Sequence, residues 1–203
     1  MKWLFDNEMV PYLRRKFHLS EAIYSRVLKV ADLGESAVDD KIGHLIANSS
    51  NPTVGVLALP GQVDVRIAAK ASDKEEAMRL IAPVEAEVRG LLGNAIFAVD
   101  DDTLEKVVGK LLREKNKTVA VYEDISGGLL AERMQSASAE HFLAGFISNG
   151  KLSLRACLGR VREPDKLEQT TRDPAALTDE LAWCARAQAG SDFGLALHSI
   201  PDL

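Results

Sequence analysis

The residues with the clearest capacity for chemistry lie in one segment, residues 118–132, with the sequence TVAVYEDISGGLLAE. It begins with a β-branched and apolar run at 118–122, which is typical of a buried strand. Asp124 and Ser126 lie in the turn that follows, and the leucines after Gly128 take helical spacing. A strand, a turn of small residues and a helix leave backbone N–H groups free at the positive end of the helix dipole.

The turn at 123–128 has two interpretations. Converging N–H donors at the start of a helix can hold a phosphate or stabilise an oxyanion. Alternatively, Gly127 and Gly128 only allow a tight connection between strand and helix, because short motifs often occur by chance. The sequence of the turn alone does not decide between a ligand site and a structural turn.

The letters YEDISGGLL at 122–130 resemble the motif AESCTGGLL, with which the C-terminal domain of the CinA family begins. These are competence/damage-inducible proteins and nicotinamide mononucleotide amidohydrolases. Glu123, both glycines and both leucines match, and Ser126 replaces a threonine. The motif's serine, the presumed nucleophile of the family, is Asp124 here. The resemblance therefore implies a nicotinamide-nucleotide amidohydrolase homologue with an eroded active site.

Two further family positions are altered. After the strand expected at 142–147, the family has Y-S-N-E-x-K, whose tyrosine and lysine the resemblance places in the site; here the letters are ISNGK, with Ile147 for the tyrosine. The pocket-closing loop T-G-I-A-G-P keeps only Ile200. The catalytic positions implied by the resemblance are Asp124 and Ser126. The implied substrate-binding positions are Glu123, Gly127, Gly128, Asn149 and Lys151. A lysine on a loop is otherwise an ordinary surface residue, and Lys151 lies one residue nearer than in the family.

Three kinds of chemistry could use these residues. A Ser/His/Asp hydrolase needs a histidine base beside Ser126, and the spacing of neither His141 nor His198 supports one. Glu123 and Asp124 are adjacent on a turn and point different ways, and without an evident third ligand we expect no metal and no cofactor. For hydrolysis without the motif serine, Asp124 could act as a base on water, or Ser126 could replace the nucleophile. Both routes remain open.

Residues 25–99 follow the order β-α-β-β-α-β, which predicts a split βαβ sandwich. We expect strands at 25–30, 53–58, 62–68 and 95–99. The second and third should form a hairpin, with Val63, Val65 and Ile67 facing inward. Ser72-Asp73 should begin the second helix, Pro83 should kink or restart it, and Leu91-Leu92-Gly93-Asn94 should end it. This unit resembles the KH-like middle domain of the CinA family. Its Gly90-Leu91-Leu92-Gly93 matches an RNA-binding GxxG motif in letters, but its place at a helix end favours a C-cap with two buried leucines.

Residues 101–203 resemble the C-terminal CinA domain and alternate helices with strands, which predicts a layered α/β/α domain. Asp102 and Glu105 have capping-box spacing for a helix at 103–115. Residues 135–140 are small and polar, as in a loop, and strands are expected at 142–147 and 193–197. Asp173-Pro174 should begin a helix with a proline in its first turn. The fold class is therefore α/β, with a KH-like α+β domain at 23–100 and the layered domain at 101–203.

The first 22 residues are expected to be the tail of a missing upstream domain, since EMVPYL resembles the end of the family's N-terminal domain. Residues 2–17 have helical spacing, with a break or kink at Pro11. The resemblance implies that the chain is a fragment, without the remaining strands and helix of the C-terminal domain.

The composition narrows the possible partners. The formal net charge of −5 favours neither nucleic acid nor an anionic membrane. No apolar run is long enough to span a bilayer, and the first eight residues are too acidic for a signal peptide. Cys157 and Cys184 fit no metal-ligand spacing. We expect a cytoplasmic protein, a homodimer or larger through helices at 103–115 and 174–188, with nicotinamide mononucleotide or a related phosphate as its ligand. The alternative is a non-catalytic module for nucleotide binding or self-association.

Overall fold

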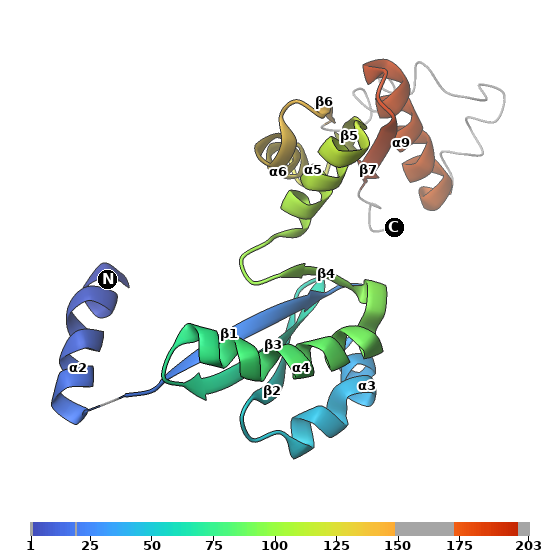
Figure 1. Cartoon of the computed structure of the whole chain (residues 1–203). Coiled ribbons are helices and arrows are strands. Elements are labelled where there is room, and N and C mark those ends of the chain that lie inside the picture. Colours follow the sequence, from blue (N-terminus) through green and yellow to red (C-terminus); the bar gives the residue numbers. More distant parts are fainter. Residues whose placement is uncertain (1, 19, 149–172, 199–203) are drawn as a thin grey trace. The chain divides into compact units, whose positions relative to one another are not determined.

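The computed structural model describes residues 2–18, 20–148 and 173–198. The chain divides into two compact units, Met1–Asp102 and Thr103–Leu203, which are described separately (Figure 1). Among the described residues, no helix is both long and apolar enough to cross a membrane.

The N-terminal helical segment comprises α1 (Lys2–Leu4), the π-helical turn η1 (Phe5–Met9) and α2 (Val10–Phe17). The predicted break at Pro11 is absent: Pro11 lies in the first turn of α2, where its missing N–H is tolerated, and a π-helical turn precedes it. His18 ends the helix in the left-handed conformation. The large apolar side chains of this segment are exposed: Trp3, Leu4, Phe5, Met9, Tyr12 and Phe17.

The first unit contains a four-stranded sheet with two helices. Its elements are β1 (Ala22–Val30), α3 (Glu35–Asn48), β2 (Thr53–Leu59), β3 (Gln62–Ala71), α4 (Lys74–Leu92) and β4 (Ile96–Val99), with a 3-10 turn, η2 (Gly93–Ala95), before β4. The strand order is β2-β3-β1-β4, and neighbouring strands are antiparallel. The predicted β-α-β-β-α-β order is confirmed, in the ferredoxin-like arrangement.

Period-two alternation builds the core of this unit. Val63, Val65 and Ile67 of β3 are buried, as the alternation predicts. The hairpin between β2 and β3 is also confirmed, with Leu59 opposite Gln62 and Gly61 at φ 79° in the two-residue turn.

Helix α4 begins as expected but is not interrupted. Asp73 caps it by accepting a hydrogen bond from the Glu76 N–H at 2.8 Å. The predicted restart at Pro83 is wrong, because α4 continues through the proline as one helix. Ile81 and Val88 are buried on either side of the proline, and such packing supplies most of a helix's stability.

The C-terminal end of α4 agrees with the predicted C-cap. Gly93 has a φ of 53° and donates its N–H to the Arg89 carbonyl. Gly90 lies within the last turn of the helix. Of the two leucines expected to be buried, Leu92 is buried and Leu91 is exposed.

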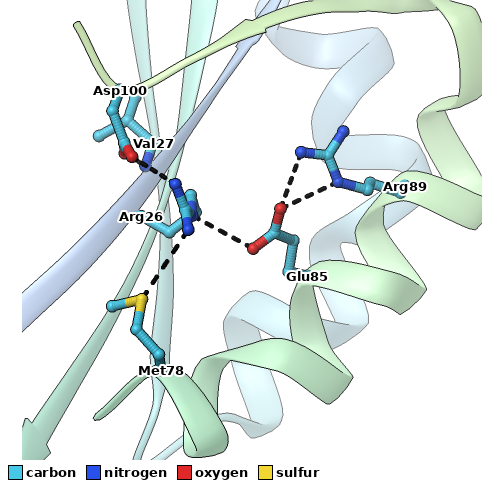
Figure 2. A network of polar contacts seen from close by, with 6 residues as sticks. All are labelled: Arg26, Val27, Met78, Glu85, Arg89 and Asp100. Atoms are coloured by element: carbon cyan, nitrogen blue, oxygen red, sulfur yellow. Dashed lines mark hydrogen bonds and ion pairs between the residues drawn. The ribbon is translucent and has the colours of Figure 1, made fainter. Parts of the chain in front are cut away.

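A polar network ties the end of β4 to β1 and α4 (Figure 2). The Arg26 Nη1 atom lies 2.5 Å from Asp100 Oδ2, and Nε lies 3.3 Å from Glu85 Oε2. Asp100 Oδ1 accepts from the Val27 N–H at 2.9 Å. Glu85 also accepts from Arg89 Nε and Nη2, at 2.9 and 2.8 Å. The network fixes the path of the chain just beyond β4.

The second unit has three layers. Its described elements are α5 (Leu104–Lys115), β5 (Val119–Glu123), α6 (Leu129–Ser138), β6 (Phe142–Ile147), α9 (Pro174–Ala189) and β7 (Phe193–Leu197). The sheet has the order β6-β5-β7, and both pairings are parallel. Val119 and Val121 of β5 pack in the cluster with α5 and α6, whereas Ala120 and Tyr122 pack in the cluster with α9. The expected layered α/β/α arrangement is confirmed.

Two local predictions for this unit are wrong. Thr103, not Asp102, caps α5 and accepts from the Lys106 N–H at 3.4 Å, because Thr103 has the extended backbone that an N-cap requires. Residues 135–138, expected in a loop, belong to α6. There the helix packs closely on α5: a Cβ added at Gly109 would lie 2.7 Å from the Ala137 carbonyl oxygen. By contrast, the strands at 142–147 and 193–197 and the Asp173 cap are confirmed.

Candidate functional site

The site lies at the carboxyl edge of the parallel sheet in the second unit. The central strand is β5, and the chain places β6 on one side of it and β7 on the other. In such sheets, ligands bind beyond the carboxyl ends of the strands where the strand order reverses. The residues that directly follow the three strands are Asp124, Ser148 and His198.

Glu123, the last residue of β5, is fully buried and points to the start of α6. Its carboxylate accepts hydrogen bonds from the Ser126 hydroxyl, from the Leu130 N–H at 3.0 Å and from the Ala131 N–H at 2.9 Å. A buried carboxylate in this position satisfies N–H groups that have no partner within the helix.

The same hydrogen bonds keep Glu123 ionised. Burial raises the pKa of Glu123, but hydrogen bonds from the Ser126 hydroxyl and from the N–H groups of Ala131, Leu130 and Gly128 outweigh it, so the pKa lies below its ordinary value. An internal anion therefore occupies the helix N-terminus that the sequence suggested for a phosphate or an oxyanion.

The glycine turn has its own backbone requirement. Gly127 and Gly128 have φ angles of 62° and 108°, in the left-handed region that favours glycine. A Cβ added to Gly128 would also lie 3.0 Å from Ile147 Cδ1. Both glycines are needed for the turn whether or not a ligand binds. Ile147, at the position of the family's tyrosine, packs against this turn.

Asp124 points away from Glu123 and meets His198. Asp124 Oδ2 lies 2.5 Å from His198 Nδ1, and the two side chains are only 14% and 10% exposed. The Asp124 N–H also donates to the Leu197 carbonyl at 3.2 Å. The spacing of His198 in the sequence alone does not indicate this contact. The missed signal was its position: a histidine directly after a parallel strand lies at the same edge as Asp124.

The remaining candidate residues divide into two groups. Ser126 is hydrogen-bonded to Glu123 and belongs to the cap of α6. Asn149 and Lys151 lie outside the described residues. Within the described ranges, no three His, Cys, Asp or Glu side chains are grouped as metal ligands are.

The opposite edge of the sheet is held by Asp192. Its carboxylate accepts from Lys117 Nζ at 2.7 Å, from the Thr118 N–H at 2.9 Å and from the Thr118 hydroxyl at 3.0 Å. The hydrogen bond from Lys117, followed by those from Thr118, lowers the pKa of Asp192 to about 2. These contacts fix the starts of β5 and β7, and thus help to align their carboxyl ends.

The fold and the site define a protein with a ferredoxin-like unit followed by a three-layer unit that has its candidate site beyond parallel strands. Comparisons with known proteins identify its relatives. The family model described as the CinA KH domain of a damage-inducible protein matches residues 25–98, and that of the CinA C-terminal domain matches residues 101–200. The chain belongs to the CinA family.

Similar proteins have the same affiliation. A putative competence-damage inducible protein from Moorella thermoacetica is 37% identical over 96% of this chain and 47% of its own length. A CinA-like protein from Acaryochloris marina is 37% identical over 97% of this chain and 47% of its own length. The chain thus spans about half the length of the curated relatives it matches. The crystal structure of competence/damage inducible protein CihA from Agrobacterium tumefaciens is similar over 49% of this chain and 62% of that chain, with 19% identity and a TM-score of 0.42.

Proposed function

We propose that the second unit is a nicotinamide-nucleotide binding module of the amidohydrolase type that no longer hydrolyses the amide by the serine route. The observation that carries the proposal is the environment of Asp124. This residue stands where the family motif has a serine, and its carboxylate is paired with His198 at 2.5 Å. A carboxylate attacking an amide would form an anhydride and expel a poor leaving group, so Asp124 is a poor substitute for the nucleophile.

Ser126 is also badly placed to replace the nucleophile. Its hydroxyl donates to Glu123, whose hydrogen bonds to α6 lower the pKa of the carboxyl and make it a weaker base. Moving Ser126 toward a substrate would remove one of the donors that hold Glu123 in place. Ile147 adds no proton donor or acceptor at the position of the family's tyrosine.

The arrangement also limits where a nucleotide would bind. The first turn of α6 already holds the Glu123 carboxylate, so a phosphate there would meet a like charge. We therefore place the phosphate away from this turn and the base near the carboxyl ends of β5 and β7. Asp124 and His198 are the residues that directly follow these two strands.

A coupled ammonia assay with nicotinamide mononucleotide tests the loss of catalysis. We expect no ammonia above background from the unmodified chain, and none from Asp124→Ser, because Ile147 still replaces the tyrosine. Isothermal titration calorimetry with the same nucleotide tests binding. Turnover by the unmodified chain that disappears in Ser126→Ala would overturn the proposal and identify Ser126 as the nucleophile.

A second candidate function is self-association, favoured by an apolar groove in the second unit. The groove has a volume of about 580 Å³ and lies between α5 and β7. Leu111, Phe193 and Leu195 line it and are about half exposed. Among the described residues, β7 pairs only with β5, so its other edge is open, and open edges recruit partners. Light scattering at micromolar concentration should give a dimer or larger, and Leu195→Lys should shift it toward monomer. A monomeric mass would contradict this candidate.

We do not propose RNA as a ligand of the first unit. Gly90 lies in the last turn of α4 and Gly93 is its C-cap, whereas an RNA-binding GxxG motif forms a loop that clamps the nucleic-acid backbone. Filter binding of single-stranded RNA at physiological salt should detect no micromolar affinity. Binding that is lost on replacing Gly90 and Gly93 would show the opposite.

A further inference from the structure

Asp124 and His198 form a pair in which the carboxylate contacts one of the two ring nitrogens of the histidine. An ionised carboxylate has no proton to donate and can only accept hydrogen bonds. Its close contact with Nδ1 therefore requires a proton on that nitrogen. In a neutral imidazole the other nitrogen, Nε2, then carries a lone pair and is an acceptor. Among the described residues, Nε2 of His198 has no hydrogen-bond partner.

The backbone holds this pair in position. Residues Glu123 and Leu197 are opposite each other in the parallel register of β5 and β7. The next residues, Asp124 and His198, are therefore neighbours, and the Asp124 N–H donates to the Leu197 carbonyl at 3.2 Å. Both side chains are largely buried, so the imidazole is held by a carboxylate that solvent competes with only weakly.

We propose that Asp124 fixes the tautomer of His198, and that His198 thereby presents Nε2 as a hydrogen-bond acceptor to a ligand at the carboxyl edge of the sheet. This assigns the specificity-determining role to His198 and a positioning role to Asp124. Neither residue is the nucleophile of the motif. The pair distinguishes ligands by the chemical group that they place at Nε2.

A fixed acceptor selects ligands by the protons they carry. A primary carboxamide offers an N–H to Nε2, whereas a carboxylate offers only lone pairs and is repelled. Sites built around a hydrogen bond to one group discriminate against an analogue that lacks the donor, because the site's polar atom is left unpaired. On the basis of the proposed nucleotide function, the site distinguishes an amide from the corresponding acid through His198.

The test compares the affinities of nicotinamide mononucleotide and nicotinic acid mononucleotide by calorimetry at pH 8. The unmodified chain should bind the amide at least roughly tenfold more tightly, the equivalent of one hydrogen bond. His198→Phe should abolish the difference. Asp124→Asn should reverse it, because an asparagine N–H donated to Nδ1 moves the imidazole proton to Nε2. His141→Phe, which replaces a histidine outside the site, should leave the ratio unchanged.

Nitrogen-15 NMR of the imidazole provides a readout independent of ligand affinity. It should find the proton on Nδ1 of His198 in the unmodified chain and on Nε2 in Asp124→Asn, with unchanged far-UV circular dichroism. Failure of both nucleotides to bind would overturn the proposed function and, with it, the ligand role of Nε2. Equal binding of the two nucleotides, or a proton on Nε2 in the unmodified chain, would overturn this inference alone.

Discussion

The polar clusters of the two units differ in the hydrogen bonds and ion pairs that their side chains form. In the first unit, Arg26 meets Asp100 and Glu85, and Glu85 also accepts from Arg89. In the second, Asp124 contacts Nδ1 of His198, and among the described residues Nε2 has no hydrogen-bond partner. The first cluster also has an atom without a hydrogen bond, Arg26 Nε, but that atom is buried and lies 3.3 Å from Glu85 Oε2. The comparison indicates that the first cluster positions elements, whereas the second supplies the acceptor that our proposal requires.

Two strand glycines, one in each sheet, differ in the space around them. In the second unit, a Cβ added to Gly194 of β7 would lie 2.0 Å from the Ala182 carbonyl oxygen of α9. In the first unit, Gly55 of β2 has no atom within 4 Å of such a Cβ. One strand glycine is thus required by packing and the other is not. This contrast gives a matched pair of substitutions.

We expect the largest effect from Gly194→Ala, which should destabilise the second unit by about 3 kcal/mol or more, because a backbone atom of α9 would have to move. Urea unfolding followed by Trp183 fluorescence, in a Trp3→Phe background, measures it. Gly55→Ala is the control and should leave this transition unchanged. Equal small effects of both substitutions would refute the difference in packing.

Glu123→Ala should follow, with a loss of about 2–3 kcal/mol, because it leaves the Leu130 and Ala131 N–H groups and the Ser126 hydroxyl without their buried acceptor. The same fluorescence transition reports it. Ser126→Ala removes one donor and leaves the two backbone bonds, so it should cost about 1 kcal/mol. A larger loss from Ser126→Ala than from Glu123→Ala would contradict the capping role of Glu123.

In the first unit, Arg26→Met should cost about 1 kcal/mol, since its side chain is 30% exposed and its pairing with Asp100 is partly screened. Arg26 Nε is buried and close to Glu85 but lacks hydrogen-bond geometry, which also limits the gain. Urea unfolding followed by far-UV circular dichroism measures the change. Arg89 also binds Glu85 but is more exposed than Arg26, so Arg89→Met should lower the stability by less. A larger loss from Arg89→Met would mean that Arg26 does not organise the network.

The smallest effect is the pH dependence that Asp192 contributes. Its folded pKa of about 2 is below the ordinary aspartate value, so the contribution is full above pH 4 and is lost as pH falls from about 4 to about 2. The stability difference between the unmodified chain and Asp192→Asn should therefore shrink over that interval. A difference that stays constant from pH 5 to pH 2 would show that the contacts with Lys117 and Thr118 do not depend on the charge.

Much of the local structure was determined by the sequence itself. Alternation predicted the buried side of β3, and the strands at 142–147 and 193–197 were predicted with their observed bounds. Asp173 and Pro174 marked the start of α9 because caps and first-turn prolines depend on neighbouring residues alone. These signals act over a few residues, so no knowledge of distant contacts was needed.

Tertiary packing decided what local signals could not. It carried α4 through Pro83, by burying Ile81 and Val88, and extended α6 over residues predicted as a loop. The candidate site depends on it most. Asp124 and His198 are 74 residues apart, and only the parallel register that sets Glu123 opposite Leu197 makes them neighbours. The sequence motif identified the altered residue at position 124, but which side chain it meets is determined by strand pairing across the sheet.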